Sequence, residues 1–300
     1  MSFIDLAKNY KIKPATPETV EKESFQSLLS KSESIAFTRE GFPVLLDVMA
    51  QTGYTVRNSM LVLAQTKSFS FLKSFNDWKK AGRSIKKGET AIRICVPATD
   101  GENMFRVEKV FDVSQTDGKE PFVEAPKHAR LSSPGTITRV TKYLMFRIDA
   151  ESVEVIENCP KPIAFDLKKG VLLISDTITD EQAFSWLVRA GAVNGYRNDP
   201  FVREVIKSGE DIDPRMANYI DFVADASAYV AAKSAGLSVA DFDVSRIETI
   251  KEIFGEDTKL CDGGMREGMD VVYASSTCLL DELEQKIPSR SQSIEPERER

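Results

Sequence analysis

One short segment carries much of the positive charge of a chain that is acidic overall. The 300 residues have a formal net charge of −6. Between Arg57 and Arg93, nine Lys and Arg residues stand against two acids, Asp77 and Glu89. This basic segment therefore carries +7, and the remaining residues carry −13. So many cations cannot share a buried core, and their concentration favours a polyanionic partner.

Aromatic residues are interleaved with these cations. Phe69, Phe71, Phe75 and Trp78 all lie inside the basic segment. Cations contact phosphates and flat rings stack on unpaired bases, the combination found in grooves that bind single-stranded nucleic acid. A plainer interpretation makes the cations a solvated face and the rings part of a core, so Trp78 is either a stacking platform or a core residue.

The sequence around the cations predicts helices followed by a β-hairpin. Helices are expected from Thr16 to about Leu29, over 38–51 and over 55–66, and a short one from Asn76 to Ala81 closed by Gly82. Alternation predicts strands over 91–96 and 104–113, joined by a turn at Asp100–Gly101. Ile92, Ile94 and Val96 would form one face of the first strand. Phe105, Val107, Phe111 and Val113 would share the apolar face of the second.

Length and composition favour two ordinary domains in a reducing compartment. Three hundred residues with 42% hydrophobic content can bury two cores. The four cysteines (95, 159, 261 and 278) are widely spaced and predict free thiols. The N-terminus lacks a signal-peptide pattern and no apolar run is long enough to span a bilayer, so we expect a cytoplasmic protein without a membrane partner. The single histidine, His128, is expected in an exposed loop.

The second half predicts a mostly helical domain. Thr179–Gln182 is a capping box that opens a helix with Phe184, Leu187 and Val188 on its apolar side. A strand pair is expected over 166–174, and the region 137–156 combines a helical or mixed segment with a strand. Further helices are expected from Asp213–Pro214 to Gly236, over 243–255 and near 275–286, with a Gly-rich turn at 262–264. The tail from Pro288 to Arg300 is expected to be disordered.

An ordered series of motifs resembles a known family. The series is Arg57–Asn58, Leu61, Gln65, Trp78–Arg83, Lys86–Glu89 and Val110–Thr116. It resembles the N-terminal domain of ArdC-type antirestriction proteins and of the LtrC-like proteins of conjugative elements. That domain is regarded as binding single-stranded DNA. Asn58 and Gln65, seven residues apart on one helix face, could hydrogen-bond a nucleotide or a neighbouring strand.

The resemblance and the charge pattern together give a set of candidate nucleic-acid-binding residues, some cationic, some polar and one aromatic. They are Arg57, Asn58, Gln65, Trp78, Lys79, Lys80, Arg83, Lys86, Lys87, Arg93 and Gln115.

The second half resembles the zinc-peptidase-like domain that follows in this family, but without its metal ligands. Ala228–Val230 and Gly236–Ser238 match the family's later helix, and Asp225 falls at the acidic ligand. Arg189, Ala190 and Val193 stand where the His-Glu-x-x-His motif is expected. Zinc hydrolysis needs about three protein ligands and a general base, so the resemblance implies a catalytically inactive domain without metal or other cofactor. Asp221 and Asp225 are either a functional acidic pair, solvent-facing residues, or partners of Arg189 or Arg215.

These observations predict an α+β protein with a helix-plus-β-hairpin domain over 1–120 and a mostly helical, zincin-like domain over 135–287. The expected function is binding of single-stranded DNA for a mobile genetic element, in antirestriction, conjugation or replication, and not enzymatic catalysis. The alternative is a protein–protein interaction module in which the second domain binds a host or element-encoded partner.

Overall fold

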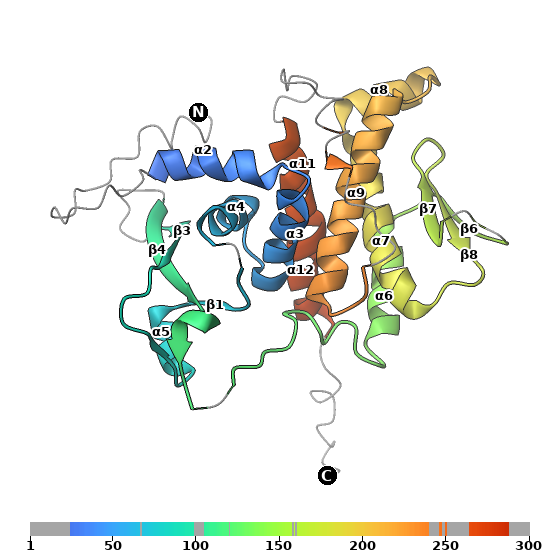
Figure 1. Cartoon of the computed structure of the whole chain (residues 1–300). Helices are drawn as coiled ribbons and strands as arrows, with labels where there is room; N and C mark the ends of the chain where they lie inside the picture. The colour runs from blue at the N-terminus through green and yellow to red at the C-terminus, as the bar shows by residue number, and fades with distance from the viewer. Residues whose placement is uncertain are drawn as a thin grey trace, which may run out of the picture. The chain divides into compact units, whose positions relative to one another are not determined.

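The structure, a computed structural model, describes residues 25–66, 68–98, 105–119, 121–157, 159, 161–239, 246–247, 250 and 264–287 (Figure 1). The chain divides into two compact units. The first consists of Met1–Val48 and Tyr54–Val123, and the second of Met49–Gly53 and Glu124–Arg300. Helices and small sheets occur in both, which confirms the predicted α+β class.

Three helices open the described part of the chain: α2 (Phe25–Ala36), α3 (Gly41–Thr52) and α4 (Val56–Gln65). The second and third predicted helices are confirmed to within a few residues. The predicted start at Thr16 lies outside the described residues, and the helix ends at Ala36 rather than near Leu29. α2 and α4 pack against each other, and Leu28, Leu45 and Leu61 are fully buried.

The rest of the first unit is a small β structure. Its elements are β1 (Leu72–Ser74), α5 (Phe75–Lys80), β2 (Ser84–Ile85), β3 (Ile92–Pro97), β4 (Phe105–Asp112), the 3-10 turn η1 (Val113–Gln115) and β5 (Thr116–Asp117). β1, β4 and β3 form an antiparallel sheet in that order, and β2 pairs with β5. The predicted hairpin is therefore confirmed, although its turn at Asp100–Gly101 lies outside the described residues. Gly82 ends α5 with a φ of +73°.

The predicted apolar face of β4 was wrong. Ile92 of β3 pairs with Val110, and both are buried in one core cluster with Val48 and Val62. Cys95 pairs with Val107, so Val107 and Phe111 lie on the opposite face of the sheet. Val110 and Phe111 are adjacent and both apolar, so alternation can be started from either, and a shift of one residue exchanges the two faces.

The second unit contains the remaining elements. They are α6 (Ile137–Ile148), β6 (Ser152–Ile156), β7 (Ile163–Asp166), β8 (Val171–Ser175), α7 (Asp180–Gly195), the 3-10 turn η2 (Tyr196–Asn198), α8 (Pro200–Ser208), α9 (Pro214–Ser234), α11 (Gly264–Tyr273), the π-helical turn η3 (Ala274–Cys278) and α12 (Leu279–Lys286). β6 runs parallel to β8, and β7 runs antiparallel to it. The segment predicted as a helix near 275–286 begins earlier, at Gly264. The predicted helix over 243–255 and the tail from 288 fall largely or wholly outside the described residues.

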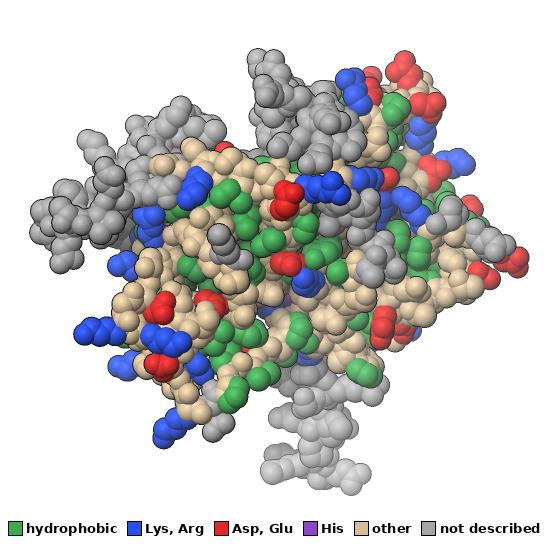
Figure 2. All heavy atoms as spheres, in the orientation of Figure 1, with side chains coloured by type: hydrophobic (Ala, Val, Ile, Leu, Met, Phe, Trp, Pro, Cys, Tyr) green, Lys and Arg blue, Asp and Glu red, His purple; other side chains and the backbone are tan. Residues whose placement is uncertain are grey.

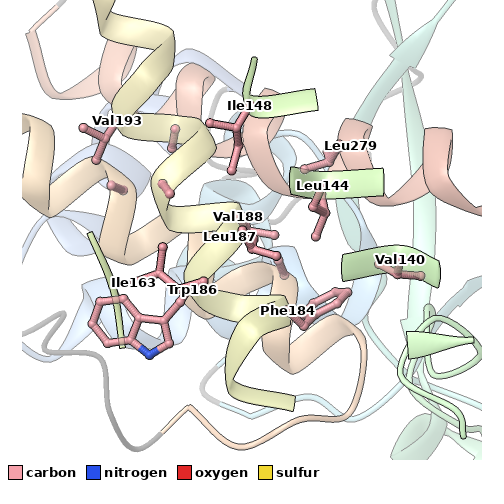
Figure 3. Close-up of a cluster of buried hydrophobic side chains, with 14 of the residues drawn as sticks. Val140, Leu144, Ile148, Ile163, Phe184, Trp186, Leu187, Val188, Val193 and Leu279 are labelled. Carbon is pink, nitrogen blue, oxygen red and sulfur yellow. The ribbon is translucent and has the colours of Figure 1, made fainter. Parts of the chain in front are cut away.

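Helix α7 is central to the core of the second unit. Thr179 caps it with the predicted capping box: the Thr179 side chain accepts from the Gln182 backbone N–H, and the Gln182 side chain accepts from the Thr179 backbone N–H. Phe184, Leu187 and Val188 of α7 lie among side chains of α6 such as Leu144 (Figure 3). α7 packs on both α6 and α9. Asp213 caps α9 as predicted, and Gly236 follows its end with a φ of +75°.

His128 is a correction to the sequence analysis, because its side chain is 2% exposed rather than lying in an exposed loop. Its backbone N–H donates to Ser234 O at 2.8 Å. Its ring nitrogens lie 3.5 Å from the Asp281 carboxylate and 3.8 Å from the Glu284 carboxylate. The turn that contains it was predicted to be a linker, whereas this residue packs into the second unit.

Cys95, Cys159 and Cys278 have free thiols, as expected, and Cys261 lies outside the described residues. Across the described part of the chain, no helix has the length and apolarity that crossing a membrane requires.

Candidate nucleic-acid interface

The cations of the basic segment differ in how far their charges are already engaged. Figure 2 shows Lys and Arg side chains over α5 with acidic groups among them. Lys79 and Lys87 are exposed. Lys80 Nζ lies 3.0 Å from Asp77, and Lys86 Nζ donates to Ser114 O at 2.8 Å. Lys79 and Lys87 are thus the two lysines of this run best placed to meet a ligand.

A groove of about 890 Å³ opens in the first unit, and residues of the basic segment form part of its lining. Four cationic side chains line it, namely Lys31, Lys87, Arg93 and Lys109, with the acids Glu89 and Asp112. Arg93 and Lys109 are cross-strand partners in the β3–β4 ladder, so they project from the same face. Gln65 and Gln115 also line the groove. Four of the predicted site residues therefore lie together here: Gln65, Lys87, Arg93 and Gln115.

The Asp112 carboxylate is used by the fold. It accepts hydrogen bonds from the backbone N–H groups of Ser70 at 2.6 Å, Phe71 at 3.0 Å and Ser114 at 2.9 Å. Burial acts to raise the pKa of Asp112, but the bonds from Ser114, Ser70 and Phe71 outweigh it and lower that pKa. Its negative charge is satisfied by these donors, so it opposes an anion in the groove less than a bare carboxylate would.

Asn58 and Gln65 bind the outer edge of β3, which was one of their two open interpretations. The Asn58 amide donates to Cys95 O at 2.8 Å and accepts from Cys95 N at 2.9 Å. Gln65 makes the same pair of bonds with Arg93, at 2.9 and 3.0 Å. Each amide thus replaces a missing neighbouring strand and protects the edge of the sheet. Gln65 thus positions Arg93, and Asn58 positions Cys95 further along the same edge strand.

Trp78 is a core residue. Its side chain is fully buried, and its indole N–H donates to Phe111 O at 2.8 Å. Its ring meets Phe122 edge to face with 5.0 Å between ring centroids. A ring enclosed in this way has no face available for a base, so of the two interpretations of Trp78 the plainer one holds.

Two other predicted residues, Arg83 and Gln115, hold neighbouring segments in place, and a third, Arg57, lies near Cys95. Arg83 donates to Thr116 Oγ1 at 2.7 Å and thereby supports the β2–β5 pair. Gln115 accepts from Asp112 N at 2.9 Å and donates to Thr90 O at 2.8 Å. Burial raises the pKa of the Cys95 thiol, and the nearby Arg57 partly offsets that rise, which places Arg57 beside β3 outside the groove.

A cluster of charged side chains, of which Arg189 and Asp225 are buried, joins α7 to α9 in the second unit. Arg189 Nε donates to Asp225 at 2.6 Å, and its Nη2 donates to Asp221. Arg246 contacts the second oxygen of Asp225. Burial acts to lower the pKa of Arg189, but the two carboxylates outweigh it and raise that pKa, so the guanidinium is charged. Of the alternatives for Asp221 and Asp225, pairing with Arg189 is the one observed.

Comparison with solved structures identifies proteins with a similar fold. The antirestriction protein ArdC from the R388 plasmid, in its metal-free structure, matches with a TM-score of 0.54 and 14% identity, over 88% of this chain and 100% of that one. Its Mn(II)-bound structure matches with a TM-score of 0.55 and 13% identity, over 87% and 99%. The chain has the ArdC fold. No protein-family model matches the sequence, and neither does any curated protein.

Both units belong to this ArdC fold, because the match covers nearly the whole of each chain. A metal ion does not fit the α7–α9 contact of the present chain. Arg189 places a permanent cation between Asp221 and Asp225, and a dication there would be repelled. Among the described residues, no group of three or more His, Cys, Asp and Glu side chains is arranged to hold a metal.

Several residues of this candidate interface could not be predicted from the sequence patterns. Lys109 reaches the groove because of its pairing with Arg93, which the correct strand phase would have revealed. Lys31 comes from α2, and no pattern in the sequence connects it to the groove. Phe75 was noted only as one of the interleaved aromatics, yet it is 57% exposed at the start of α5. It is therefore the ring of the basic segment that a base could reach.

Proposed function

We propose that this chain is a single-stranded DNA-binding protein of a mobile genetic element, acting in antirestriction, conjugation or replication. The observation that carries the proposal is the groove of the first unit, in which Lys31, Lys87, Arg93 and Lys109 line one continuous surface. Lysine and arginine side chains on such a surface neutralise backbone phosphates whatever the sequence of the strand. The fold of an antirestriction protein from a plasmid supports the biological setting.

Binding of a single strand also requires contacts to unpaired bases. Phe75 supplies an exposed ring, and Lys79 lies four residues further along the same helix, on the same face. A base stacked on this ring would be followed by phosphates near the cation. Both residues lie outside the lining of the groove, so the strand would contact α5 as well as the groove.

The second unit in this proposal is a catalytically inactive peptidase-like domain without zinc. Hydrolysis by zinc would require an open ligand position and a base to activate water. Arg189, with its charge held by Asp221 and Asp225, offers neither. The protein would act in the cytoplasm, where entering DNA is exposed to host nucleases.

One observation favours the alternative, a protein–protein interaction module. Val153 and Val155 on the edge strand β6 are 49% and 67% exposed, and Phe146 at the end of α6 is 84% exposed. Exposed apolar side chains of this size occur at protein interfaces. A protein partner for the second unit is compatible with DNA binding by the first unit.

The test is a binding titration of the full chain with fluorescent single-stranded DNA, double-stranded DNA and RNA oligomers at several salt concentrations. We expect the strongest binding to single-stranded DNA. The variant K87A/K109A should reduce the slope of log affinity against log salt by about 1.4, because each single-strand phosphate contact contributes about 0.7.

The matched control for this variant is K79A/K80A, which removes two cations from α5, outside the groove. It should lower the slope less than the groove variant does. Equal slopes for the two variants would mean that the phosphate contacts are spread over the whole basic surface. An unchanged slope for K87A/K109A would mean that the groove does not contact the strand.

A further inference from the structure

A second basic pocket lies in the second unit, where α6 ends and α7 leads through η2 into α8. Its volume is about 430 Å³, within the usual range for small-ligand sites. Three segments supply its lining: the end of α6 (Arg147, Ile148, Asp149), the end of α7 with η2 (Asn194, Arg197, Asn198), and α8 (Arg203, Ile206, Lys207). Four of these side chains are cationic and one is acidic, so the lining carries +3 in a chain of −6.

Two of the four cations have carboxylate partners. Arg147 lies 2.9 Å from Glu282, and Arg197 donates to Glu151 at 2.7 Å. Other side chains make the capping hydrogen bonds beside the pocket. The Asn194 amide donates to Ile148 O at the end of α6, and the Asp199 carboxylate caps the start of α8 through Phe201 N and Val202 N.

Arg203 and Lys207 are the remaining cations, and no ion pair joins either of them to a carboxylate among the described residues. Arg203 Nη2 donates to Asn198 O and Oδ1 at the long distances of 3.4 and 3.5 Å. The two cations lie four residues apart on α8 and share one face, where like charges destabilise a helix. An anion between them would remove that repulsion.

The chemistry of the lining specifies the kind of anion. Among the described residues that form it, none is aromatic, so the pocket offers no ring for a base to stack on. Arginine presents a planar fork of donors that matches phosphate oxygens, lysine adds a compact charge, and Asn198 adds an amide. We propose that this pocket binds the phosphate groups of a nucleic-acid strand and gives the second unit its own contact with the polyanion. The identity of that strand rests on the function proposed above.

The test uses the full chain and the variant R203Q/K207Q. Both side chains are exposed, so the variant should fold. Single-stranded DNA should bind it with a salt slope lower by about 1.4, since two phosphate contacts are lost. The control variant K142Q/K169Q removes two exposed cations of the same unit outside the pocket and should keep the wild-type slope.

A second probe, pyrophosphate alone, separates the pocket from the proposed function. It should raise the melting temperature of the wild type and of the control variant, but not that of R203Q/K207Q. The wild type could bind no oligonucleotide while pyrophosphate still raises its melting temperature and not that of R203Q/K207Q. The proposed DNA binding would then be wrong, and the pocket would be a site for a small phosphate compound. If R203Q/K207Q matches the wild type with both probes, the pocket is not a phosphate site.

Discussion

The basic segment of the first unit and the charge cluster of the second place the same kind of charge in opposite surroundings. Lys79 and Lys87 are exposed and project from α5 and from the loop before β3. Arg189 is buried between α7 and α9, and Asp221 and Asp225 neutralise it. A cation in water costs the fold little and can meet a ligand, whereas a cation in the core must have its partners built in.

This difference also explains why the two units suggest different roles within one ArdC fold. In the first unit, surplus positive charge lines an open groove. In the second, the charge of Arg189 at the α7–α9 contact is matched internally by Asp221 and Asp225.

The largest expected effect comes from breaking the buried cluster. The variant R189L should lower the free energy of unfolding by about 3–5 kcal/mol, because it leaves the Asp221 and Asp225 charges without their buried partner. Chemical denaturation measures this loss.

The matched control is K80L, which removes a cation from the exposed pair with Asp77. It should leave the free energy of unfolding nearly unchanged, since exposed pairs contribute little. Similar stabilities for R189L and the wild type would mean that the α7–α9 contact does not depend on its charges. The comparison between the two regions would then fail.

Next in size is the substitution of Trp78, which tests whether the aromatic part of the basic segment is core or surface. The variant W78F removes the indole N–H that Phe111 O accepts, and a buried carbonyl left unsatisfied costs about 1–3 kcal/mol of stability. The exposed ring of Phe75 provides the contrast. F75A should keep the wild-type stability and instead weaken single-stranded DNA binding by about 1–3 kcal/mol.

Thermal melts and binding titrations on the same two variants separate these effects. A W78F protein with wild-type stability and reduced DNA affinity would make Trp78 a stacking residue after all. An F75A protein that binds DNA as well as the wild type would remove Phe75 from the interface.

The features that the sequence predicted correctly are those set by neighbours along the chain. The capping box at Thr179 needs only Gln182, three residues away, and Gly82 closes α5 through its own backbone conformation. Such local rules depend little on the rest of the fold.

Two of the features that it predicted wrongly or missed depend on distant contacts. The phase of β4 is fixed by Val110 packing with Ile92 and α3, and the alternation of the strand alone does not show this. Lys31 enters the groove from α2, far from the basic segment in sequence. Helix α8 was not predicted, although its start has a local sequence signal: Asp199 at the N-cap and Pro200 at the first helical position.

The smallest expected effect concerns His128, whose burial contradicts its predicted place in an exposed loop. Burial lowers the pKa of the imidazole below its ordinary value of 6.5, and the nearby Lys127 adds to this, while Asp281 and Glu284 act in the opposite direction. The neutral form is therefore favoured in the folded protein. The unfolded chain binds the proton more readily, so stability is greatest above pH 6.5 and is lost as the pH falls from 6.5 through the folded-state pKa.

Because the chain has only one histidine, a single imidazole signal in proton NMR reports its titration directly. We expect the midpoint in the folded protein to lie below that of the same protein in urea. The unfolding free energy should also decrease between about pH 7.5 and pH 5.5, where histidine is the side chain that ordinarily titrates. The variant H128Q should lack most of this decrease. A folded-state midpoint above the unfolded one would instead mean that the Asp281 and Glu284 carboxylates outweigh burial, making His128⁺ a stabilising charge like Arg189.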